Sequence, residues 1–441
     1  MTYPEALRYL EYFIDYEKIP SWAYKKSLRL NRFQAFLAAL NNPQDNLRCI
    51  HVAGTKGKGS TCAFIAYILR AHGFKVGLYT SPHLIDFRER IRVLNGRAPG
   101  DFTGMVSRKE LADITNKLKP AIEQFNRESP DGPLTFFEAY TALAFTYFKE
   151  KKVDFAVLET GLGGRLDATN TVRPLVCVIT PISYEHTDKL GKTLTEIARE
   201  KAGIVKDLRN LSVIIAPQPA AALRVIRQRC NNKGVKLYEA GKHASYIHGD
   251  KDTFKVRGIF ADYPDLKIKL LGEHQLINAI AAISAVEALR LHNIRVGIQA
   301  IRDGLYDTVW PGRCEIISKK PWVVLDGAQN AASSLALKKT IKDNFKYQKL
   351  ILVLGISSDK DIKGICKELY GLADEVIFTK ADTPRAINPG VLAKYFKGKN
   401  NYLTNNVHEA RHLAKRIAGR QDLILACGSL FVVGEFRNDK S

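Results

Sequence analysis

Short apolar runs alternate with helix-like segments along most of the chain, and this alternation restricts the fold more than any other feature of the sequence. Between residues 47 and 240 each run is continuously apolar, which is typical of parallel strands buried on both faces. We therefore predict an α/β fold built on a doubly wound, mostly parallel sheet. The runs are RCIHVAG, KVGLYTS, VDFAVLET, LVCVITPIS and LSVIIAPQ, and helix-like segments such as STCAFIAYILRAHG and TLTEIAREKAGIV lie among them.

A second series of the same kind begins near residue 314 and predicts a smaller, Rossmann-like α/β domain. Its runs are CEIIS, WVVLDG, KLILVLGIS, EVIFTKA, NYLT and DLILACGS. One hydrophobic core rarely organises as many as 441 residues, which also favours two domains. Pro311 and Gly312 interrupt both periodic patterns and mark the boundary. We predict a first domain over residues 1–305, with an N-terminal helical segment and an antiparallel hairpin insert near 244–270, and a second over 306–441.

The composition is that of an ordinary soluble protein with an unusual excess of positive charge. Seven cysteines are scattered without a CxxC pair, which favours reduced thiols over a disulfide framework or a zinc site. The N-terminus lacks the pattern of a secretion signal, and no run approaches the roughly 20 apolar residues of a membrane span. We therefore expect a cytoplasmic protein with no membrane partner. The net charge of +22 predicts attraction to polyanions, but the absence of an arginine-rich tract disfavours nucleic acid.

The stretch HVAGTKGKGST, residues 51–61, places glycines and lysines between an apolar run and a helix-like pattern. A glycine-rich loop in that position can aim successive backbone N–H groups at one point, where the helix dipole adds to them, and so forms a phosphate cradle. Lys58 lies between Gly57 and Gly59, which leave it free to approach the β- and γ-phosphates. The alternative is a glycine-rich turn with solvated lysines. Gly59 stands where an ordinary P-loop has its Mg²⁺-binding hydroxyl, and Ser60 comes one residue later, so the ion needs other ligands.

Three polar residues lie at or beyond the ends of neighbouring apolar runs and are candidates for those ligands. Ser81 ends one run, Glu159 another, and His186 follows a third. In an open α/β sheet the ligand crevice lies at the carboxyl ends of the strands, so the three side chains can converge beside the phosphate loop. A hydroxyl, a carboxylate and an imidazole form a mixed set for Mg²⁺, although histidine is unusual for so hard an ion. Each residue also has a purely structural alternative. Ser81 could be a turn residue, Glu159 could be a helix-capping or ion-pair carboxylate, and His186 could be a surface loop residue.

Nine motifs in order along nearly the whole chain resemble the folylpolyglutamate synthase and dihydrofolate synthase family, the folate branch of the Mur ligase superfamily. They are HVAGTKGKGST, YTSPHLIDFRERI, TFFEAYTALAF, LETGLGGRLDATN, EHTDKLGKTLTEIAREKAGI, GEHQLINA, WPGR, LDGAQN and GSLFVVGE. The resemblance implies an ATP-dependent ligase that joins L-glutamate to the carboxylate of a folate or of dihydropteroate through an acyl phosphate, with both synthase activities. It implies small-molecule partners, and we take a monomer as the default.

Two rival functions remain open from the residues. A Mur-type amino-acid ligase of cell-wall synthesis would act on a nucleotide-linked precursor, and we would expect an additional N-terminal domain before the phosphate loop. A basic nucleic-acid-binding NTPase is supported by the net charge alone.

The resemblance also assigns roles to single residues. It implies that Lys201 is carried as a carbamate, which would hold a second Mg²⁺; the alternative is a helix-surface lysine paired with Glu196 or Glu200. It makes Lys58, His186 and Lys201 the catalytic residues. The implied ATP-binding residues are Gly57, Lys58, Gly59, Ser60, Asn278 for adenine, Arg313 for phosphate and Asp326 for ribose; the implied metal ligands are Ser81, Glu159, His186 and Lys201.

The implied folate or pteroate site consists of Thr135, Phe137 and Asp167. The Phe137 ring is able to stack on a flat heterocycle, or it is a core residue of its helix. Arg313 follows the predicted linker, so we expect it to reach the crevice on closure of the two domains.

This chain departs from the family pattern at two positions. Gln329 stands where the family has histidine, and it retains hydrogen-bonding capacity without a positive charge. Glu185 stands where aspartate usually precedes the histidine, and we expect it to orient His186.

Overall fold

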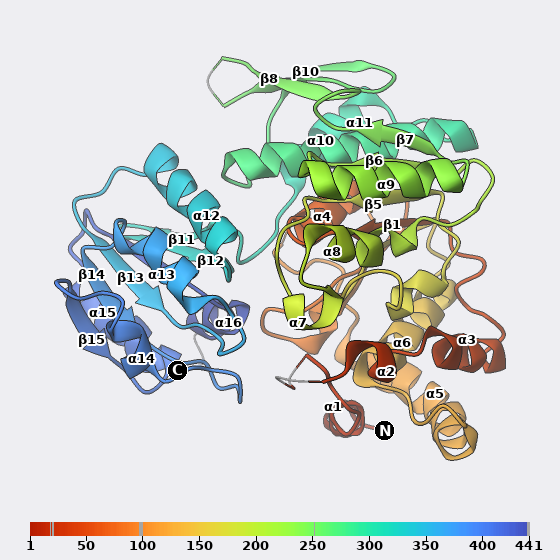
Figure 1. Ribbon diagram of the computed structural model, residues 1–441, viewed down its shortest axis with the longest axis horizontal. Helices are drawn as coiled ribbons and strands as arrows, with labels where there is room; N and C mark the ends of the chain where they lie inside the picture. Colours follow the sequence, from red (N-terminus) through yellow and green to blue (C-terminus); the bar gives the residue numbers. More distant parts are fainter. Residues whose placement is uncertain (18, 20–21, 97–99, 251, 439–441) are drawn as a thin grey trace.

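The structure is a computed structural model that describes residues 1–17, 19, 22–96, 100–250 and 252–438 (Figure 1). Within these residues a seven-stranded sheet has the order β3-β2-β4-β1-β5-β6-β7, and all its neighbours are parallel except β2 and β3. The strands are β1 (Cys49–Ala53), β2 (Val76–Tyr79), β3 (Ile91–Leu94), β4 (Phe155–Glu159), β5 (Val176–Ile179), β6 (Ser212–Ile215) and β7 (Lys236–Glu239). Every residue of β1, β4 and β5 is buried, which explains their continuously apolar sequences and confirms the predicted doubly wound sheet.

Helices cover both faces of this sheet, and successive residues of β1 point to opposite faces. Ile50 and Val52 pack in one core with α4, α10 and α11, whereas Cys49 packs in a second core with α1, α3, α5 and α6. A third core joins Ala53 to α8 and α9. The helices are α1 (Tyr3–Glu11), α2 (Tyr24–Ser27), α3 (Leu30–Ala39), α4 (Lys58–Ala71), α5 (Arg108–Glu128), α6 (Phe136–Glu150), α7 (Thr187–Leu190), α8 (Leu194–Lys201), α9 (Ala220–Asn232), α10 (Glu273–Ala288) and α11 (Ile298–Asp307), with 3₁₀ turns η1 (Phe87–Arg90), η2 (Ala168–Thr171), η3 (Ala202–Ile204) and η4 (Leu289–His292).

The insert between β7 and α10 is a small antiparallel sheet of order β10-β9-β8, formed by β8 (Ser245–His248), β9 (Phe254–Arg257) and β10 (Asp262–Leu266). The sequence predicted a two-stranded hairpin here, whereas the structure has a third strand, β10. Tyr263 and Leu266 of β10 are buried against the core of α10 and α11, and this packing is not visible in local alternation.

A six-stranded sheet lies beside the first half of the molecule, in the order β11-β12-β16-β13-β14-β15, and β11 runs antiparallel to β12 (Figure 1). Its strands are β11 (Glu315–Lys319), β12 (Trp322–Asp326), β13 (Leu350–Leu354), β14 (Glu375–Phe378), β15 (Asn400–Leu403) and β16 (Leu423–Cys427). The helices are α12 (Ala331–Asn344), α13 (Ile362–Tyr370), α14 (Pro389–Ala393), α15 (Val407–Ile417) and α16 (Leu430–Arg437). Helices α12, α13 and α14 pack in one core on one face of the sheet, and α15 and α16 pack in a second core on the other face. This confirms the predicted second α/β sheet with helices on both faces.

The two sheets are connected by the segment between Asp307 at the end of α11 and Glu315 at the start of β11. This segment contains Pro311 and Gly312. The division into domains at residues 305 and 306 stays a prediction.

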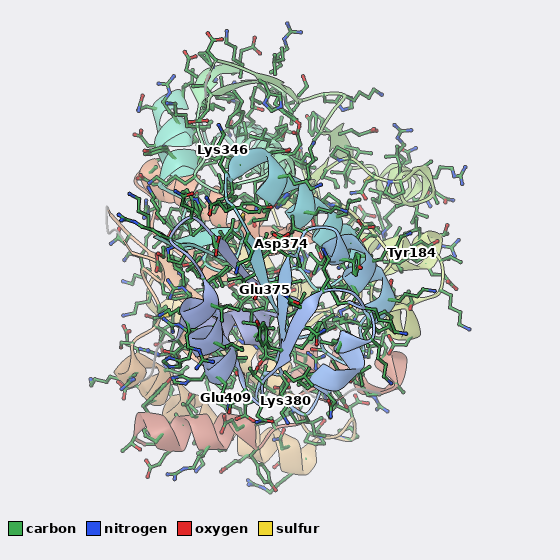
Figure 2. The ribbon with its side chains drawn as sticks, turned by 90° about the vertical axis from the view of Figure 1, so that its left-hand side faces the viewer. Tyr184, Lys346, Asp374, Glu375, Lys380 and Glu409 are labelled. Atoms are coloured by element: carbon green, nitrogen blue, oxygen red, sulfur yellow. The ribbon has the colours of Figure 1, made fainter. Side chains whose placement is uncertain are left out.

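Charges of both signs are mixed on the outer side of the six-stranded half. Figure 2 labels Lys346, Asp374, Glu375, Lys380 and Glu409 on this side. The Nζ atom of Lys349 lies 2.9 Å from Oε1 of Glu375. On this surface a lysine side chain therefore lies within ion-pair distance of a carboxylate.

Candidate active site

The carboxyl ends of four adjacent strands, β2, β4, β1 and β5, bring the predicted phosphate loop and the predicted metal ligands Ser81, Glu159 and His186 to one edge of the seven-stranded sheet. This edge borders a cavity of ≈ 400 Å³, which loops of the six-stranded half also line. The sequence-predicted residues around this nucleotide cavity are Gly57, Lys58, Gly59, Ser60, Ser81, Glu159, His186, Asn278, Arg313, Asp326 and Gln329.

The glycines of the loop after β1 are required by close contacts. Gly57 has φ 81° and is the N-cap of α4, so Lys58 is the first residue of the helix. A Cβ atom on Gly57 would lie 2.2 Å from Oδ1 of Asn278, and one on Gly59 would lie 3.1 Å from the Trp310 ring. The loop thus keeps the open N-terminus of α4 next to the cavity, which is the arrangement that binds phosphate in other proteins.

Glu159 lies opposite Lys58 at the end of β4. Its Oε1 is 3.8 Å from Nζ of Lys58, and its Oε2 accepts a hydrogen bond from the Ser81 backbone N–H at 3.2 Å. Burial raises the pKa of Glu159, and the nearby Lys58 charge opposes that rise. Glu159 therefore forms a long ion pair with Lys58 and also lines the nucleotide cavity, where its carboxylate can bind a metal ion.

His186 follows β5 in a left-handed conformation, with φ 50°. Burial, together with the positive charges of Lys360, Lys201, Lys189 and Lys58, holds its pKa well below the usual value. The imidazole is consequently uncharged at neutral pH and has a lone pair available for a cation.

Glu185 was expected to orient His186. Its described ion pair is instead with Lys360, at 3.9 Å between Oε1 and Nζ.

No group of three His, Cys, Asp or Glu side chains in the described ranges has the arrangement of a metal site. A divalent cation at this edge would therefore have to combine Glu159 and His186 with a hydroxyl such as that of Ser81. An uncharged imidazole and a carboxylate whose ion pair with Lys58 is as long as 3.8 Å fit such an ion.

Lys201 lies at the end of α8 behind the glycine-rich loop and does not line the nucleotide cavity. It is buried, and its Nζ donates a hydrogen bond of 2.6 Å to the carbonyl oxygen of Gly54. Burial, with the Lys58 charge adding to it, lowers the pKa of Lys201 to about 7. The alternative of a surface lysine paired with Glu196 or Glu200 is wrong, because Glu196 caps α8 and Glu200 binds Arg165 at 2.9 Å.

The six-stranded half contributes Arg313 and Asp326 to the nucleotide cavity. The two Asp326 oxygens accept backbone N–H groups from Cys314 and Ala328, each at 2.8 Å. Burial raises the pKa of Asp326, while Arg313 and His274 favour its charged form. We expected Arg313 to reach the crevice only when the two domains close. In this structure Arg313 already lines the cavity.

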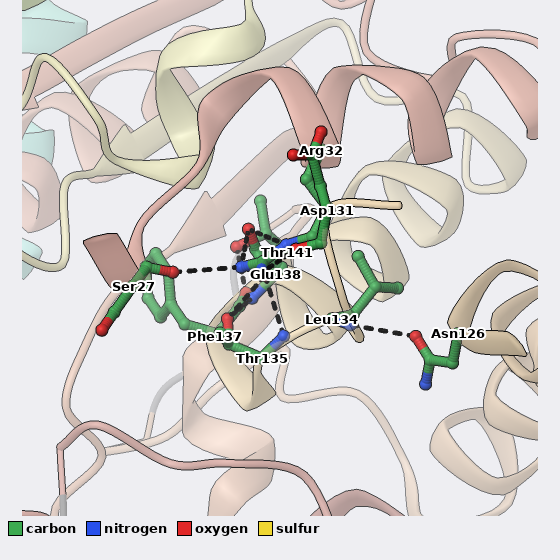
Figure 3. Close-up of polar contacts among 9 residues, drawn as sticks. All are labelled: Ser27, Arg32, Asn126, Asp131, Leu134, Thr135, Phe137, Glu138 and Thr141. Atoms are coloured by element: carbon green, nitrogen blue, oxygen red, sulfur yellow. Dashed lines mark hydrogen bonds and ion pairs between the residues drawn. The ribbon is translucent and has the colours of Figure 1, made fainter. Parts of the chain in front are cut away.

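A second cavity, of ≈ 170 Å³, is more apolar and contains all three residues predicted for the folate or pteroate site. Thr135 caps α6 and exchanges hydrogen bonds with Glu138 (Figure 3). Arg32 from α3 binds the same carboxylate through Nη2 at 2.7 and 2.9 Å, and both charged side chains are buried. The start of α6 is thereby tied to the N-terminal helices. Phe137 lines this apolar cavity and also packs against Tyr79, with ring centroids 5.9 Å apart, so its position is compatible with both alternatives.

Asp167 is held in the same cavity by its own loop. Its carboxylate accepts hydrogen bonds from the Leu162 N–H at 2.9 Å and from the Thr169 hydroxyl at 2.5 Å. Burial raises the pKa of Asp167 despite these bonds.

Sequence reasoning missed the N-terminal segment of the apolar cavity, where Ile14, Glu17 and Trp22 lie, because no motif marks it. It also missed a third cavity, of ≈ 720 Å³, lined by Lys56, Lys189 and Lys360. The strand-end rule applied to the loop after β13 would have found Lys360. His186 lines all three cavities.

Helices with the length and hydropathy of a bilayer span are absent from the described part of the chain. Family models match two regions: the Mur ligase middle domain matches residues 115–286, and the Mur ligase glutamate ligase domain matches residues 312–430.

Relatives and solved structures cover nearly the whole chain. The dihydrofolate synthase/folylpolyglutamate synthase of Bacillus subtilis is 35% identical over 96% of this chain and 99% of that protein. A Mycobacterium tuberculosis folylpolyglutamate synthase complexed with ADP superposes with a TM-score of 0.88 at 28% identity, covering 99% of this chain and 97% of that one. Escherichia coli FolC in complex with DHPP and ADP gives 0.83 at 30% identity, covering 99% and 97%. With these matches and this site, the chain belongs to the dihydrofolate synthase/folylpolyglutamate synthase family of Mur ligases.

Proposed function

We propose that this protein is an ATP-dependent ligase that joins L-glutamate to the carboxylate of dihydropteroate or of a folate, and that it has both synthase activities. The observation that carries the proposal is the meeting of three cavities at His186. Such a reaction has three substrates, whose carboxylate, γ-phosphate and amine must come together at one place. The named relatives support the same reaction, since the B. subtilis protein carries both activities in its name.

The nucleotide cavity is assigned to ATP. A carboxylate oxygen of the acceptor attacks the γ-phosphorus, the bond to the β-phosphate oxygen breaks, and ADP leaves with the electron pair. Because charge accumulates on the transferring phosphoryl oxygens, groups that position and neutralise it supply most of the catalysis. In this proposal Lys58, Ser60 and the N–H groups at Gly57 and Gly59 hold the phosphates, and Arg313 adds a second positive charge. Asn278 and Asp326 contact adenine and ribose.

Ser81, Glu159 and His186 would hold Mg²⁺, which would supply positive charge to offset the negative charge of the phosphates. A second Mg²⁺ would require a carbamate on Lys201. In support of that modification, Lys201 is buried with a lowered pKa, so part of its amine is uncharged and able to react with carbon dioxide. The carbamate would present acceptor oxygens, and its remaining Nζ–H can still donate to the Gly54 carbonyl oxygen.

The apolar cavity is assigned to the pterin end of the acceptor. Phe137 offers a ring face, while Asp167 and Thr135 offer fixed polar groups. Ser81, Gly161, His186 and Gln329 line both this cavity and the nucleotide cavity. A molecule that extends from the first therefore brings its carboxylate to the phosphate site.

The third cavity is assigned to glutamate, because charges of both signs line it. Its three lysines suit the two carboxylates, and its acidic residues, Glu185, Asp188, Asp359 and Asp361, suit the amino group. The amine attacks the acyl phosphate, the tetrahedral intermediate collapses, and phosphate leaves while the amine loses a proton to solvent. We further propose a monomer of two domains, residues 1–305 and 306–441, that adjust around the substrates.

An isotope experiment tests the proposal. Dihydropteroate with an ¹⁸O-labelled carboxylate is incubated with ATP, Mg²⁺, L-glutamate and the protein. We expect dihydrofolate as the product and one labelled oxygen in the released phosphate, because the acyl phosphate transfers it. Product without label in the phosphate would overturn the acyl-phosphate route, and absence of product would overturn the dihydrofolate synthase assignment.

A further inference from the structure

A separate cavity of ≈ 290 Å³ lies between α8, η3 and α9, which pack against each other (Figure 1). Four of its residues, at positions 225, 228, 229 and 232, recur at the spacing of a single face of α9. The lining consists of Arg165, Arg199, Ala202, Gly203, Val225, Gln228, Arg229 and Asn232. None of these residues lines the three substrate cavities.

The charge of this arginine cavity is unbalanced. Three arginines line it, and no carboxylate is among its described lining residues. Arg165 is paired with Glu200, but the Arg165 side chain is still 46% exposed. Arg199 forms no ion pair within 4 Å in the described ranges, and Arg229 donates its Nε–H to a backbone oxygen, that of Val205, at 3.1 Å. Like charges that line one cavity repel each other, in contrast to the mixed charges on the face shown in Figure 2.

The cavity is held in shape by its own backbone contacts. A Cβ atom on Gly203 would lie 2.4 Å from the Cβ atom of Arg165, so only glycine fits at this position of the cavity lining. The Arg165 N–H donates to the Glu200 carbonyl oxygen at 2.8 Å. Asn170 Nδ2 donates to the carbonyl oxygens of Arg165 and Gly203, at 3.1 and 3.2 Å. The base of Arg165 is therefore fixed before any ligand arrives.

We propose that the arginine cavity is a binding site for a multivalent oxyanion, that is, a small molecule with two or more closely spaced phosphate or carboxylate groups. Guanidinium groups bind both kinds of oxyanion through paired N–H donors. The side-chain amides of Gln228 and Asn232 add neutral donors.

The site is distinct from the nucleotide cavity. Arg199 and Lys201 are two residues apart on α8, which places them on nearly opposite sides of the helix. Lys201 points inward to Gly54, whereas Arg199 is exposed in the arginine cavity. An anion bound there leaves the proposed phosphate loop free, so the inference does not depend on the proposed ligase activity.

Calorimetric titration of the full chain tests the site. The protein is first saturated with a non-hydrolysable ATP analogue and then titrated separately with inorganic tripolyphosphate and with a γ-linked glutamate trimer. Two variants are compared with the unmodified protein. Arg199→Gln removes a cavity cation that has no described ion pair, and Arg295→Gln removes an exposed arginine outside the cavity.

We expect one further anion to bind per chain. Its affinity should fall about tenfold or more in Arg199→Gln, because a charge-assisted hydrogen bond is lost there, and should stay unchanged in Arg295→Gln. The probe that binds more tightly identifies phosphate or carboxylate as the natural group. Absence of binding by both probes, or an equal loss in the two variants, would overturn the proposal, since an equal loss reports only the general field of the protein.

Discussion

The nucleotide cavity and the apolar cavity share an edge but are built by different means. The nucleotide cavity is lined by loops that follow strands and by residues of α10 and α12, and its phosphate-loop groups are set by local backbone geometry, as at Gly57 and Lys58. The apolar cavity is assembled from the N-terminal segment, the start of α6 and the loop that carries Asp167. Its walls depend on contacts between distant parts of the chain, such as the Arg32–Glu138 pair.

This difference predicts different consequences of substitution. Charges in the nucleotide cavity act on the transferring phosphoryl group, so their loss should lower turnover. Side chains of the apolar cavity contribute contact area to one substrate, so their loss should weaken the binding of that substrate alone.

The largest effect is expected for Lys58→Ala. Removal of the charge nearest the transferring phosphoryl group should lower kcat by on the order of 10² or more. Lys58 is the first residue of α4 and its ion pair with Glu159 is long, so the unfolding midpoint should change little, which thermal denaturation checks beside the ligase assay. Near-normal turnover in a folded variant would refute the phosphate-loop assignment.

Glu159→Gln and His186→Ala should each raise the Mg²⁺ concentration required for half-maximal activity by roughly 10- to 100-fold, because each removes a proposed ligand or its charge. Magnesium titrations at saturating ATP measure this. Lys346→Gln, on the outer side of the six-stranded half, is the comparison variant and should leave the magnesium requirement unchanged. Titration curves that coincide with those of the unmodified protein would exclude the three-ligand set.

Lys201→Ala should lose about tenfold or more of the activity, because a buried position behind the phosphate loop would lose the proposed oxygen ligand. Added short carboxylates should restore part of it by supplying those oxygens. Native mass measurement should show the added mass of one carbon dioxide molecule on the unmodified protein and not on the variant. An unmodified and dispensable lysine would leave the Gly54 hydrogen bond as its only role.

Phe137→Ala should raise KM for the pteroyl substrate by up to about tenfold, in line with the loss of one aromatic contact and its area, while KM for ATP stays constant. Phe137→Tyr, which keeps a ring, should retain most of the affinity. Equal changes in both KM values would show that the substitution disturbs α6 as a whole and would remove the contrast between the two cavities.

The smallest effect concerns the net charge of +22. Each γ-linked glutamate adds about one negative charge to a folate at neutral pH. If part of the positive charge serves to attract that tail, KM for a triglutamylated folate should rise a few-fold more with salt than KM for the monoglutamate, because salt screens the field. The same salt response for both substrates would indicate that the excess charge reflects general composition.

The sequence was sufficient for the parts that local rules govern. Continuous apolar runs identified the buried strands, and the strand-end rule brought Ser81, Glu159 and His186 to one cavity. Local rules failed where packing decides. Strand β3 pairs antiparallel at the sheet edge, and Lys201 is buried although its helix reads as a surface helix.

The missed parts of the site have the same cause. Trp22 and Glu17 reach the apolar cavity only because the N-terminal helices fold against α6. Lys360 follows a strand of the other sheet, and its approach to Glu185 depends on how the two halves pack.

The most direct test of the central claim, that three substrates meet at His186, is ADP release by the purified protein with ATP and Mg²⁺. Dihydropteroate, tetrahydrofolate, a nucleotide-linked cell-wall precursor and single-stranded DNA are compared, each with and without L-glutamate. We predict sustained ADP release only when a pteroyl acceptor and glutamate are both present, with dihydropteroate and tetrahydrofolate both active. Sustained release with DNA or the cell-wall precursor, or release that needs no pteroyl acceptor, would contradict the account.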